Sequence, residues 1–392
     1  MCESLKYPFF SIVIPTKGRP DLLQDAISSV LRQDFSDYEL IVSDNFNDNR
    51  TRKVVELFKG NSSIRYFRTE CELNMPLHWE FATKKTLGKY VLILTDRSVL
   101  KQHALTTIHK ELVDHPEVAI CSWRWSLYDA KNGIEFYKTI DQRLQEVEIL
   151  PTSFVARDFV RKSTNYPYSL PRGLNSCYRA DLAEHVREKH GALFLPISPD
   201  YSSAFLLLAY APSIIHINKS LFISQGLAVS NGGNAMASNG DSYLNTLNLP
   251  DPYKYVPIKR FIVESGIFSD FLMVKEITNG NLANVEMDWE EYFVACYREI
   301  YEKISRNVLN KTAIAKIVLS WDLALKNSNT NIQINVKRRL RRFKLLVVLK
   351  RSMFGPPLLY IKHSVKALRS VGRQPDHKTV IEAAGFRIEI KK

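Results

Sequence analysis

The first hundred residues alternate short apolar runs with segments whose apolar residues recur at helical spacing. Residues 9–15 (FFSIVIP) form a near-continuous apolar run, as in a strand buried on both faces. From Pro20, apolar residues recur every three or four positions, which predicts a helix to Leu31. The alternation predicts further strands at 38–42, 63–67 and 90–94 and helices at 50–58 and 75–86. We therefore predict an α/β fold with a mostly parallel sheet flanked by helices.

Beyond residue 96 the pattern continues and then becomes less regular. It predicts helices at 103–113, 179–189 and 200–210 and strands at 118–125, 214–217 and 221–223. Between them, Asn132-Gly133 favours a hairpin turn and residues 165–173 a surface loop. Residues 226–241 are rich in Gly, Asn and Ser, which indicates a loop or a domain boundary, and 250–330 have a helical pattern. We expect three parts: an α/β domain at 1–240, a helical C-terminal region at 241–336 and a basic tail at 337–392.

The net charge of +13 belongs to one segment. Residues 337–373 hold twelve Lys and Arg and no acidic residue, whereas residues 1–336 hold 38 basic and 38 acidic residues. A nucleic-acid enzyme usually carries its positive charge over the folded body, so this distribution makes nucleic acid an unlikely partner. Five scattered cysteines without a CxxC pair support neither a disulfide framework nor a zinc site. With no apolar run near 20 residues, we expect a cytoplasmic protein without a spanning helix.

Polar residues follow three of the predicted parallel strands. They are Pro15-Thr16-Lys17-Gly18-Arg19, Ser43-Asp44-Asn45 and Thr95-Asp96-Arg97-Ser98. Ligands of open parallel sheets bind at the carboxyl ends of strands, so the three loops together suggest a site for an anionic ligand. Any one of them alone could be a polar loop with helix caps. The GxGxxG fingerprint and the P-loop are absent, which argues against Rossmann dehydrogenases and P-loop NTPases.

The residues around these loops carry a resemblance to a known family. The stretch FSIVIPTKGRPDLLQDAISSVLRQDFSDYELIVSDNFND resembles the opening of family 2 glycosyltransferases of the GT-A fold. The stretch GKYVLILTDRSVL resembles the strand that leads to their metal-binding DxD motif, and Asn74–Glu80 resembles the segment before it. Ser198-Pro199-Asp200 and the apolar helix after it resemble the segment that supplies the catalytic base. The resemblance covers residues 9–235.

This resemblance implies an inverting, hexosyltransferase-like enzyme of polysaccharide biosynthesis that uses a nucleoside-diphosphate sugar. Asp200 would be the base that deprotonates the acceptor hydroxyl. Asp96 and Ser98 would bind the metal, Mg²⁺ or Mn²⁺. The nucleotide-sugar donor would contact a set of loop residues: Pro15, Thr16, Arg19, Asp44, Asn45, Thr95 and Arg97. The acceptor would be a surface glycan or lipid-linked oligosaccharide precursor.

The sequence departs from the family pattern at two motifs. The last position of DxD is Ser98 rather than an acidic residue, so metal affinity would be weaker or the Arg97 cation would partly replace the metal. The Glu-Asp usual at the base is Pro-Asp here. The Gln-x-x-Arg-Trp motif of processive synthases is absent, which favours single additions. The alternative function is a catalytically inactive sugar-nucleotide-binding protein or a membrane scaffold.

Several further residues have two readings. His216 and Trp79 favour core packing over ligand contact. Tyr166, Tyr168, Arg172 and Asn175 fit an acceptor pocket or a plain surface loop, and Lys17 fits a phosphate contact or a solvated side chain.

The basic tail interleaves cations with apolar residues. Gly355-Pro356-Pro357 interrupts it, which predicts two short amphipathic helices. Such helices can lie on an anionic membrane surface through residues 337–373 and would make the protein peripheral on the inner face of the cell membrane. The alternative is that their apolar faces pack on residues 250–330.

Overall fold

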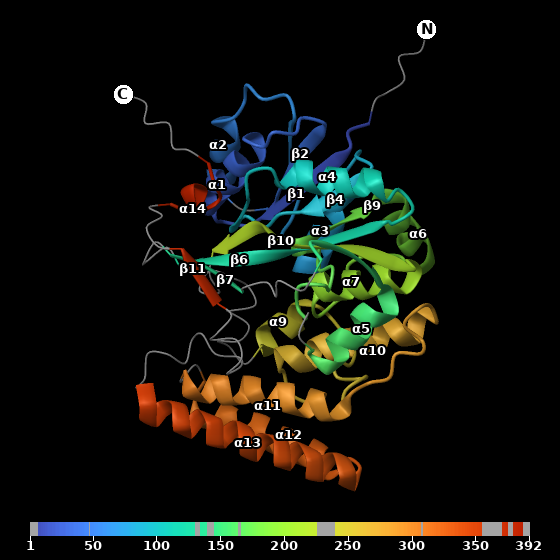
Figure 1. The fold of residues 1–392 in the computed structure, drawn as a ribbon, viewed down its shortest axis with the longest axis vertical. Coiled ribbons are helices and arrows are strands. Elements are labelled where there is room, and N and C mark those ends of the chain that lie inside the picture. Colours follow the sequence, from blue (N-terminus) through green and yellow to red (C-terminus); the bar gives the residue numbers. More distant parts are fainter. Residues whose placement is uncertain are drawn as a thin grey trace.

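The structure is a computed structural model and describes residues 7–46, 48–129, 134–138, 145–163, 166–225, 240–306, 309–354, 371–374 and 379–386. The predicted hairpin turn at Asn132-Gly133, nearly all of the segment 226–241 and the second tail helix lie outside these residues. Figure 1 shows a central sheet with helices on both faces and further helices stacked at one end.

The sheet of the described residues has eleven strands and is mixed. Its first half consists of β1 (Phe10–Thr16), β2 (Tyr38–Asp44), β3 (Ile64–Arg68) and β4 (Tyr90–Ile93), which pair in parallel in the order β3-β2-β1-β4. The remaining strands are β5 (Ser98–Leu100), β6 (Ile120–Asp129), β7 (Ile134–Lys138), β8 (Val147–Pro151), β9 (Ser176–Arg179), β10 (Ser213–Gln225) and β11 (Val371–Gln374). Among these, only β10 and β6 pair in parallel; β9 joins the two halves by antiparallel pairing with β4 and β6.

Helices cover both faces of the sheet. One face packs against α1 (Pro20–Leu31), α2 (Arg50–Glu56) and α4 (Ala104–Asp114). The other packs against α3 (Met75–Thr83), α5 (Thr152–Arg161), α6 (Ala180–His190) and α7 (Pro199–Tyr210). Helix α7 is buried on nearly all sides, as its almost wholly apolar sequence requires.

The C-terminal region is helical and shares the core of the sheet domain. It contains α9 (Asp241–Thr246), α10 (Val263–Thr278), α11 (Trp289–Ser305), α12 (Lys311–Lys326) and α13 (Thr330–Phe354). One apolar cluster runs without interruption from Ile93 in the sheet through Phe205 in α7 and Phe268 in α10 to Trp321 in α12. The short helix α14 (Val380–Ala383) lies against β10 and α1 at the other end of the molecule (Figure 1).

The predicted fold class, an α/β sheet flanked by helices with a helical C-terminal region, is confirmed. The parallel pairing is concentrated in the first four strands. Residues 147–161, which had no predicted structure, form β8 and α5, and the two predicted strands after residue 213 are one long strand, β10. The division at residues 240 and 336 stays a prediction. Helix α13 crosses residue 336 and ends just before Gly355.

Candidate functional site

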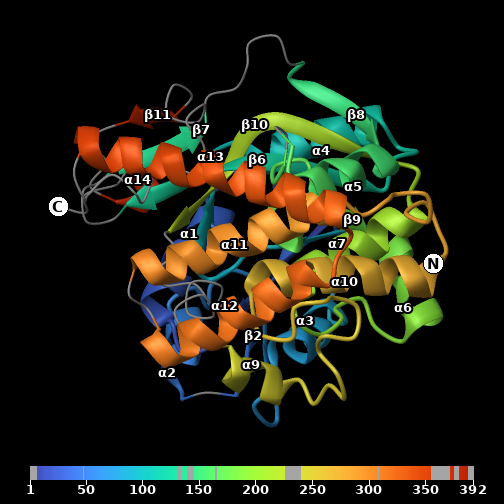
Figure 2. The same cartoon turned by 90° about the horizontal axis from the view of Figure 1, so that it is seen from below.

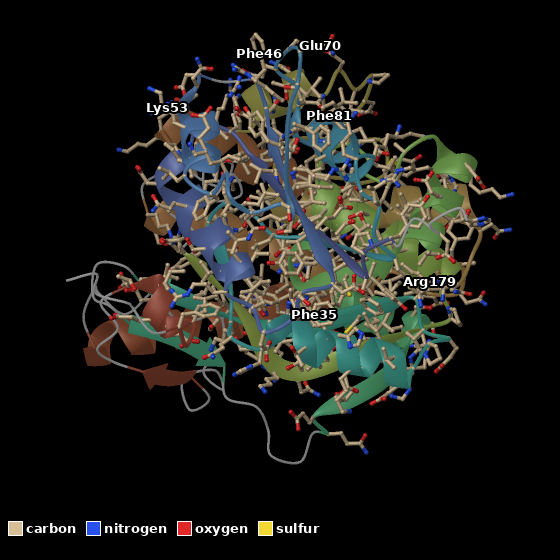
Figure 3. All side chains as sticks on the ribbon, turned by 90° about the horizontal axis from the view of Figure 1, so that it is seen from above. Phe35, Phe46, Lys53, Glu70, Phe81 and Arg179 are labelled. Atoms are coloured by element: carbon tan, nitrogen blue, oxygen red, sulfur yellow. The ribbon has the colours of Figure 1, made fainter. Side chains whose placement is uncertain are left out.

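The three predicted loops meet at the carboxyl edge of the parallel strands. Thr16 and Asp44 are partners in the β1–β2 register, and the loop with Asp96 follows the neighbouring strand β4. Pro15 is a buried residue of β1 that pairs with Ser43 in the register with β2, and it directly precedes Thr16 at the site. Figure 3 shows Phe35 and Phe46 at opposite ends of β2, and Phe46 marks the end at which the loops gather.

Asp96 is the centre of a polar cluster at this edge. Its carboxylate accepts a hydrogen bond from the Thr16 hydroxyl at 2.9 Å and forms an ion pair with Arg19 at 3.2 Å. Burial raises the pKa of the Asp96 carboxyl, and the Arg19 charge and the Thr16 hydroxyl oppose that rise. The Arg19 charge therefore favours the ionised form of the buried Asp96 carboxyl.

Asp44 has one occupied and one unoccupied oxygen. The Tyr66 hydroxyl donates to Oδ2 at 2.8 Å, whereas Oδ1 is buried and has no hydrogen-bond partner in the described part of the chain. Burial raises the pKa of Asp44, and the Tyr66 hydroxyl, the Arg68 charge and the nearby Thr51 hydroxyl, itself buried without a hydrogen-bond partner among the described residues, counteract it. A buried carboxylate oxygen without a partner is costly, so it is a natural acceptor for a ligand N–H or O–H. Tyr66 has no signal in the sequence that would have identified it.

An aromatic ring lies next to Asp44. Phe46 is 48% exposed, unusually open for a phenylalanine, and the Arg68 guanidinium lies 5.6 Å from its ring centroid. Figure 3 shows Phe46 and Glu70 close together at the rim of the molecule, as expected because the Thr69 amide donates to the Asp44 carbonyl. An exposed ring beside a carboxylate can stack on a planar ligand.

Five of the residues that the sequence analysis singled out make contacts within or between the loops. Asn45 pairs with both backbone groups of Leu73, accepting from N–H at 2.9 Å and donating to the carbonyl at 2.8 Å. The hydroxyls of Thr95 and Ser98 lie 2.9 Å apart. Arg97 donates to the Ser224 hydroxyl at 2.6 Å, which ties the loop to β10. Lys17 pairs with Glu72 at 2.5 Å on the exposed surface.

Asp200 lies in the first turn of α7, on the second residue of the helix. Burial raises the pKa of its carboxyl, and the charges of Arg172 and Arg97 lower it. Burial lowers the pKa of Arg97, and the charges of Asp96 and Asp200 both counteract this, so both carboxyl groups are within electrostatic reach of Arg97. This links the α7 carboxylate with the loop after β4, although 103 residues separate the two loops in the sequence.

Aromatic side chains surround Arg172. Its guanidinium lies 4.8 Å from the Trp125 ring centroid and donates to the Tyr201 hydroxyl at 3.2 Å. Tyr166 in turn lies 3.2 Å from Tyr201, hydroxyl to hydroxyl. Tyr168 packs on Trp125 at 4.6 Å between centroids.

The other tentative residues have structural roles. Asn175 is fully buried and its amide donates to the carbonyls of Tyr168 and Leu170, so it shapes this loop from within. His216 is packed in the core beside Ser122, and burial lowers its pKa to about 4. Trp79 packs edge-on against Phe194. The favoured reading of His216 and Trp79 as core residues is therefore confirmed.

A divalent metal would find a small set of oxygen ligands here. No group of three or more His, Cys, Asp and Glu that could hold a metal occurs among the described residues. Mg²⁺ and Mn²⁺ are nevertheless held in many sites by one carboxylate together with substrate phosphates. The Asp96 carboxylate fits such a shared site, with the Ser98 hydroxyl on the same loop as a neutral oxygen. Arg19 would then have to give up one Asp96 oxygen.

Comparison with known proteins identifies the first part of the chain. Residues 11–169 match the model of glycosyl transferase family 2. One curated relative is the GalNAc(5)-diNAcBac-PP-undecaprenol beta-1,3-glucosyltransferase of Campylobacter jejuni, 35% identical over 103 residues. The match covers 26% of this chain and 33% of the relative, so this chain spans about one third of that protein's length.

Solved structures with a similar course of the chain include two sugar-nucleotide complexes. S. aureus TarS 1-349 in complex with UDP-GlcNAc is 15% identical at a TM-score of 0.49, covering 84% of this chain and 91% of that chain. The mannosyltransferase PcManGT from Pyrobaculum calidifontis in complex with GDP-Man and Mn²⁺ is 12% identical at a TM-score of 0.43, covering 89% and 88%.

Proposed function

Because residues 11–169 carry a glycosyl transferase family 2 domain, as the sequence resemblance indicated, we propose that the protein transfers a sugar from a nucleoside-diphosphate donor to an acceptor hydroxyl, with inversion. The observation that carries the proposal is the cluster of Thr16, Arg19 and Asp96 at the carboxyl edge of the parallel strands, and the Arg97 side chain next to it feels the charges of both Asp96 and Asp200. A single displacement needs a base at the acceptor hydroxyl and positive charge at the leaving diphosphate, and Asp200 with the arginines near Asp96 can supply both.

The donor nucleotide lies against the ends of β1 and β2 in this proposal. The unpartnered Asp44 Oδ1 accepts a hydrogen bond from the base or the ribose, and the Phe46 ring stacks on the base. Thr16 and Arg19 hold the diphosphate next to Asp96. Pro15, Asn45 and Thr95 contribute by fixing the backbone of these loops.

Charge develops on the leaving nucleoside diphosphate. Arg19 and Arg97 are the protein's own cations at this point, and preorganised charges there stabilise the transition state. A divalent metal held by Asp96 and Ser98 would add Lewis-acid stabilisation of the leaving diphosphate when bound. The replacement of the usual acidic residue by Ser98 makes the arginines more important in this chain.

Asp200 is the base in this mechanism. It removes the proton from the acceptor hydroxyl as the oxygen attacks the anomeric carbon from the face opposite the leaving group. A raised carboxyl pKa brings the base closer to the pH at which proton transfer is efficient, and Arg172 and Arg97 keep it ionised.

The acceptor side is lined by Arg172 and its aromatic neighbours. Tyrosine, tryptophan and arginine are well suited to sugar rings and phosphates. The Campylobacter relative is named for a lipid-linked oligosaccharide acceptor, which supports an acceptor of this class. The acceptor proposed for this chain is therefore a glycan on a lipid diphosphate.

A lipid-linked acceptor requires access to a membrane surface. Leu319 and Leu323 of α12 are 68% and 57% exposed, and Ile334 of α13 is 57% exposed. Lys337 and Arg341 are exposed one and two turns further along α13. Figure 2 views the molecule from the side on which α12 and α13 lie. We assign this α12–α13 face to an anionic membrane; no helix of the described residues has the length and apolarity to span one.

Two substitutions test the proposal in an assay for nucleoside diphosphate release from UDP-, GDP- and dTDP-hexoses. Asp200→Asn should lower turnover about 100- to 10,000-fold with unchanged donor affinity, because only the base is lost. Asp181→Asn is the matched control, since Asp181 holds the same position in the first turn of α6. Turnover by Asp200→Asn at the wild-type rate would remove the base assignment.

Asp96→Asn tests the diphosphate end. Wild type should bind its nucleotide more tightly with Mn²⁺ than with chelator in calorimetry, and the variant should lose that difference. An equal gain with Mn²⁺ in both proteins would contradict metal binding by Asp96. If no hexose donor is turned over by wild type while the nucleotide still binds, the inactive sugar-nucleotide-binding alternative is correct.

A further inference from the structure

The turn that precedes Asp200 is held by the C-terminal helical region. The Ser198 amide donates to Asp270 Oδ2 in α10 at 2.8 Å. One residue earlier, the Ile197 carbonyl accepts from the Tyr243 hydroxyl in α9 at 2.7 Å. Both contacts come from residues that lie beyond the family match and beyond the resemblance seen in the sequence.

The backbone of this turn is strained. Ile197 has φ +81°, a conformation that β-branched residues rarely adopt and that persists only when the surroundings impose it. Helix α10 makes this possible by close approach, because a Cβ on Gly266 would lie 2.7 Å from Ile197 Cγ2. Tyr243 in α9 and Gly266 and Asp270 in α10 thus hold residues 197 and 198 in place.

The turn determines where Asp200 lies. Ser198 is the N-cap of α7, its side chain makes no capping hydrogen bond, and Asp200 follows two residues later. A carboxyl group at a helix N-terminus also interacts favourably with the helix dipole. Any shift of Ser198 is passed to the first turn of α7 and hence to the Asp200 carboxylate.

Burial of the Asp270 carboxyl group costs folding free energy. Its side chain is fully buried, and Oδ1 has no hydrogen-bond partner among the described residues. Burial raises the pKa of Asp270 well above its usual value, and the nearby Asp200 charge raises it further. Stability alone would favour an apolar side chain here, since half-satisfied buried carboxyls destabilise a fold.

We propose that Asp270 is a positioning residue for Asp200, and that the C-terminal helical region completes the active site through it. The proposal rests on the proposed role of Asp200 as base. Asp270 does not touch the substrate. It accepts the hydrogen bond from the Ser198 amide, and this bond fixes the turn from which the helix with Asp200 begins.

The experiment compares Asp270→Ala with Asp270→Asn in the full chain. The alanine variant removes the acceptor of the Ser198 amide and should lower kcat about 10- to 100-fold at unchanged donor KM, because misplacing a reacting group by about 1 Å has this effect. The asparagine variant keeps an acceptor oxygen and should recover kcat to within about threefold of wild type. Asp288→Ala is the matched control, since the Asp288 carboxylate likewise accepts a hydrogen bond from a backbone amide, that of Glu291 in α11.

Gly266→Ala gives a second test that changes no charge and favours the helix. Its methyl group should displace Ile197, so kcat should fall about tenfold while Tm and donor KM stay near the wild-type values. It also decides the matter if Asp270→Ala does not fold. Wild-type kcat in folded Asp270→Ala or in Gly266→Ala would overturn the positioning role.

The two proposals can fail separately. If Asp200→Asn retains full turnover, the base assignment is wrong. If Asp200→Asn is inactive while Gly266→Ala and Asp270→Ala turn over like wild type, only the positioning role is wrong.

Discussion

The free oxygen of Asp44 gives a prediction whose size can be worked out from the structure. Asp44→Asn has nearly the same shape. Because the Tyr66 hydroxyl must donate to one side-chain oxygen, the amide oxygen takes that place and the NH₂ group occupies the position of Oδ1. A group that only donates then faces the N–H or O–H of the nucleotide.

The expected loss follows from the strength of hydrogen bonds to charged groups. Such a bond contributes about 1.5 to 3 kcal/mol, so the dissociation constant for the nucleotide should rise about 10- to 150-fold. Calorimetry at pH 8 favours the ionised carboxyl despite its raised pKa. Tyr66→Phe is the control, because it leaves Oδ1 in place and should weaken binding by less than about threefold.

A set of nucleotides separates the two contacts open to Asp44. The measurement uses UDP, GDP, dTDP and CMP, each with and without Mn²⁺. A loss confined to nucleotides whose base carries a ring N–H points to the base, whereas an equal loss for all ribonucleotides, with dTDP spared, points to the ribose. If Asp44→Asn binds every nucleotide within twofold of wild type, the carboxylate does not contact the donor.

Two further predictions concern stability and location. Burial lowers the pKa of His216 and of His78 to about 4 from 6.5, so the unfolded chain binds more protons in this range. The free energy of unfolding should therefore fall as pH falls from 6.5 to 4, by up to about 3 kcal/mol per histidine. Urea titrations over this pH range should show a smaller fall for His216→Gln than for wild type. On the α12–α13 face, the double variant Lys337→Glu, Arg341→Glu should no longer sediment with anionic liposomes, because each lost charge removes about 1 kcal/mol of attraction. The control Lys53→Glu on α2 should sediment like wild type. Equal sedimentation of wild type, the double variant and the control would refute a membrane role for this face.

Most of the first half of the fold could be predicted from the sequence. β1 and β4 are buried on both faces and are therefore apolar almost throughout, and β2 has the buried apolar run Leu40–Val42 at its centre, so their composition alone marks them. β8 and α5 were missed for the opposite reason. Val147–Pro151 is a half-exposed strand of mixed composition, and its place is set by antiparallel pairing with β10, more than 60 residues away.

The candidate site divides in the same way. Thr16, Asp44 and Asp96 follow consecutive parallel strands, so strand order alone predicts that they lie at one edge. The sequence cannot indicate that Arg19 pairs with Asp96 or that Tyr66 occupies one oxygen of Asp44, because each contact joins residues 22 or more positions apart. Asp270 has no local signal at all, since a single aspartate in an apolar helix is equally compatible with a solvated position.

The continuous core explains why the proposed base, Asp200, depends on a region beyond the sequence resemblance at residues 9–235. Helix α7 is buried on nearly every side, so it needs cover both from the sheet domain and from α10. The same packing that buries Phe205 against Phe271, at 5.3 Å between ring centroids, brings Asp270 to the N-terminus of α7. The packing that buries α7 therefore also places the Asp200 carboxylate. Residues 1–240 alone would leave exposed the face of α7 that α10 covers. The turn before Asp200 would also lack its hydrogen bonds with Tyr243 and Asp270.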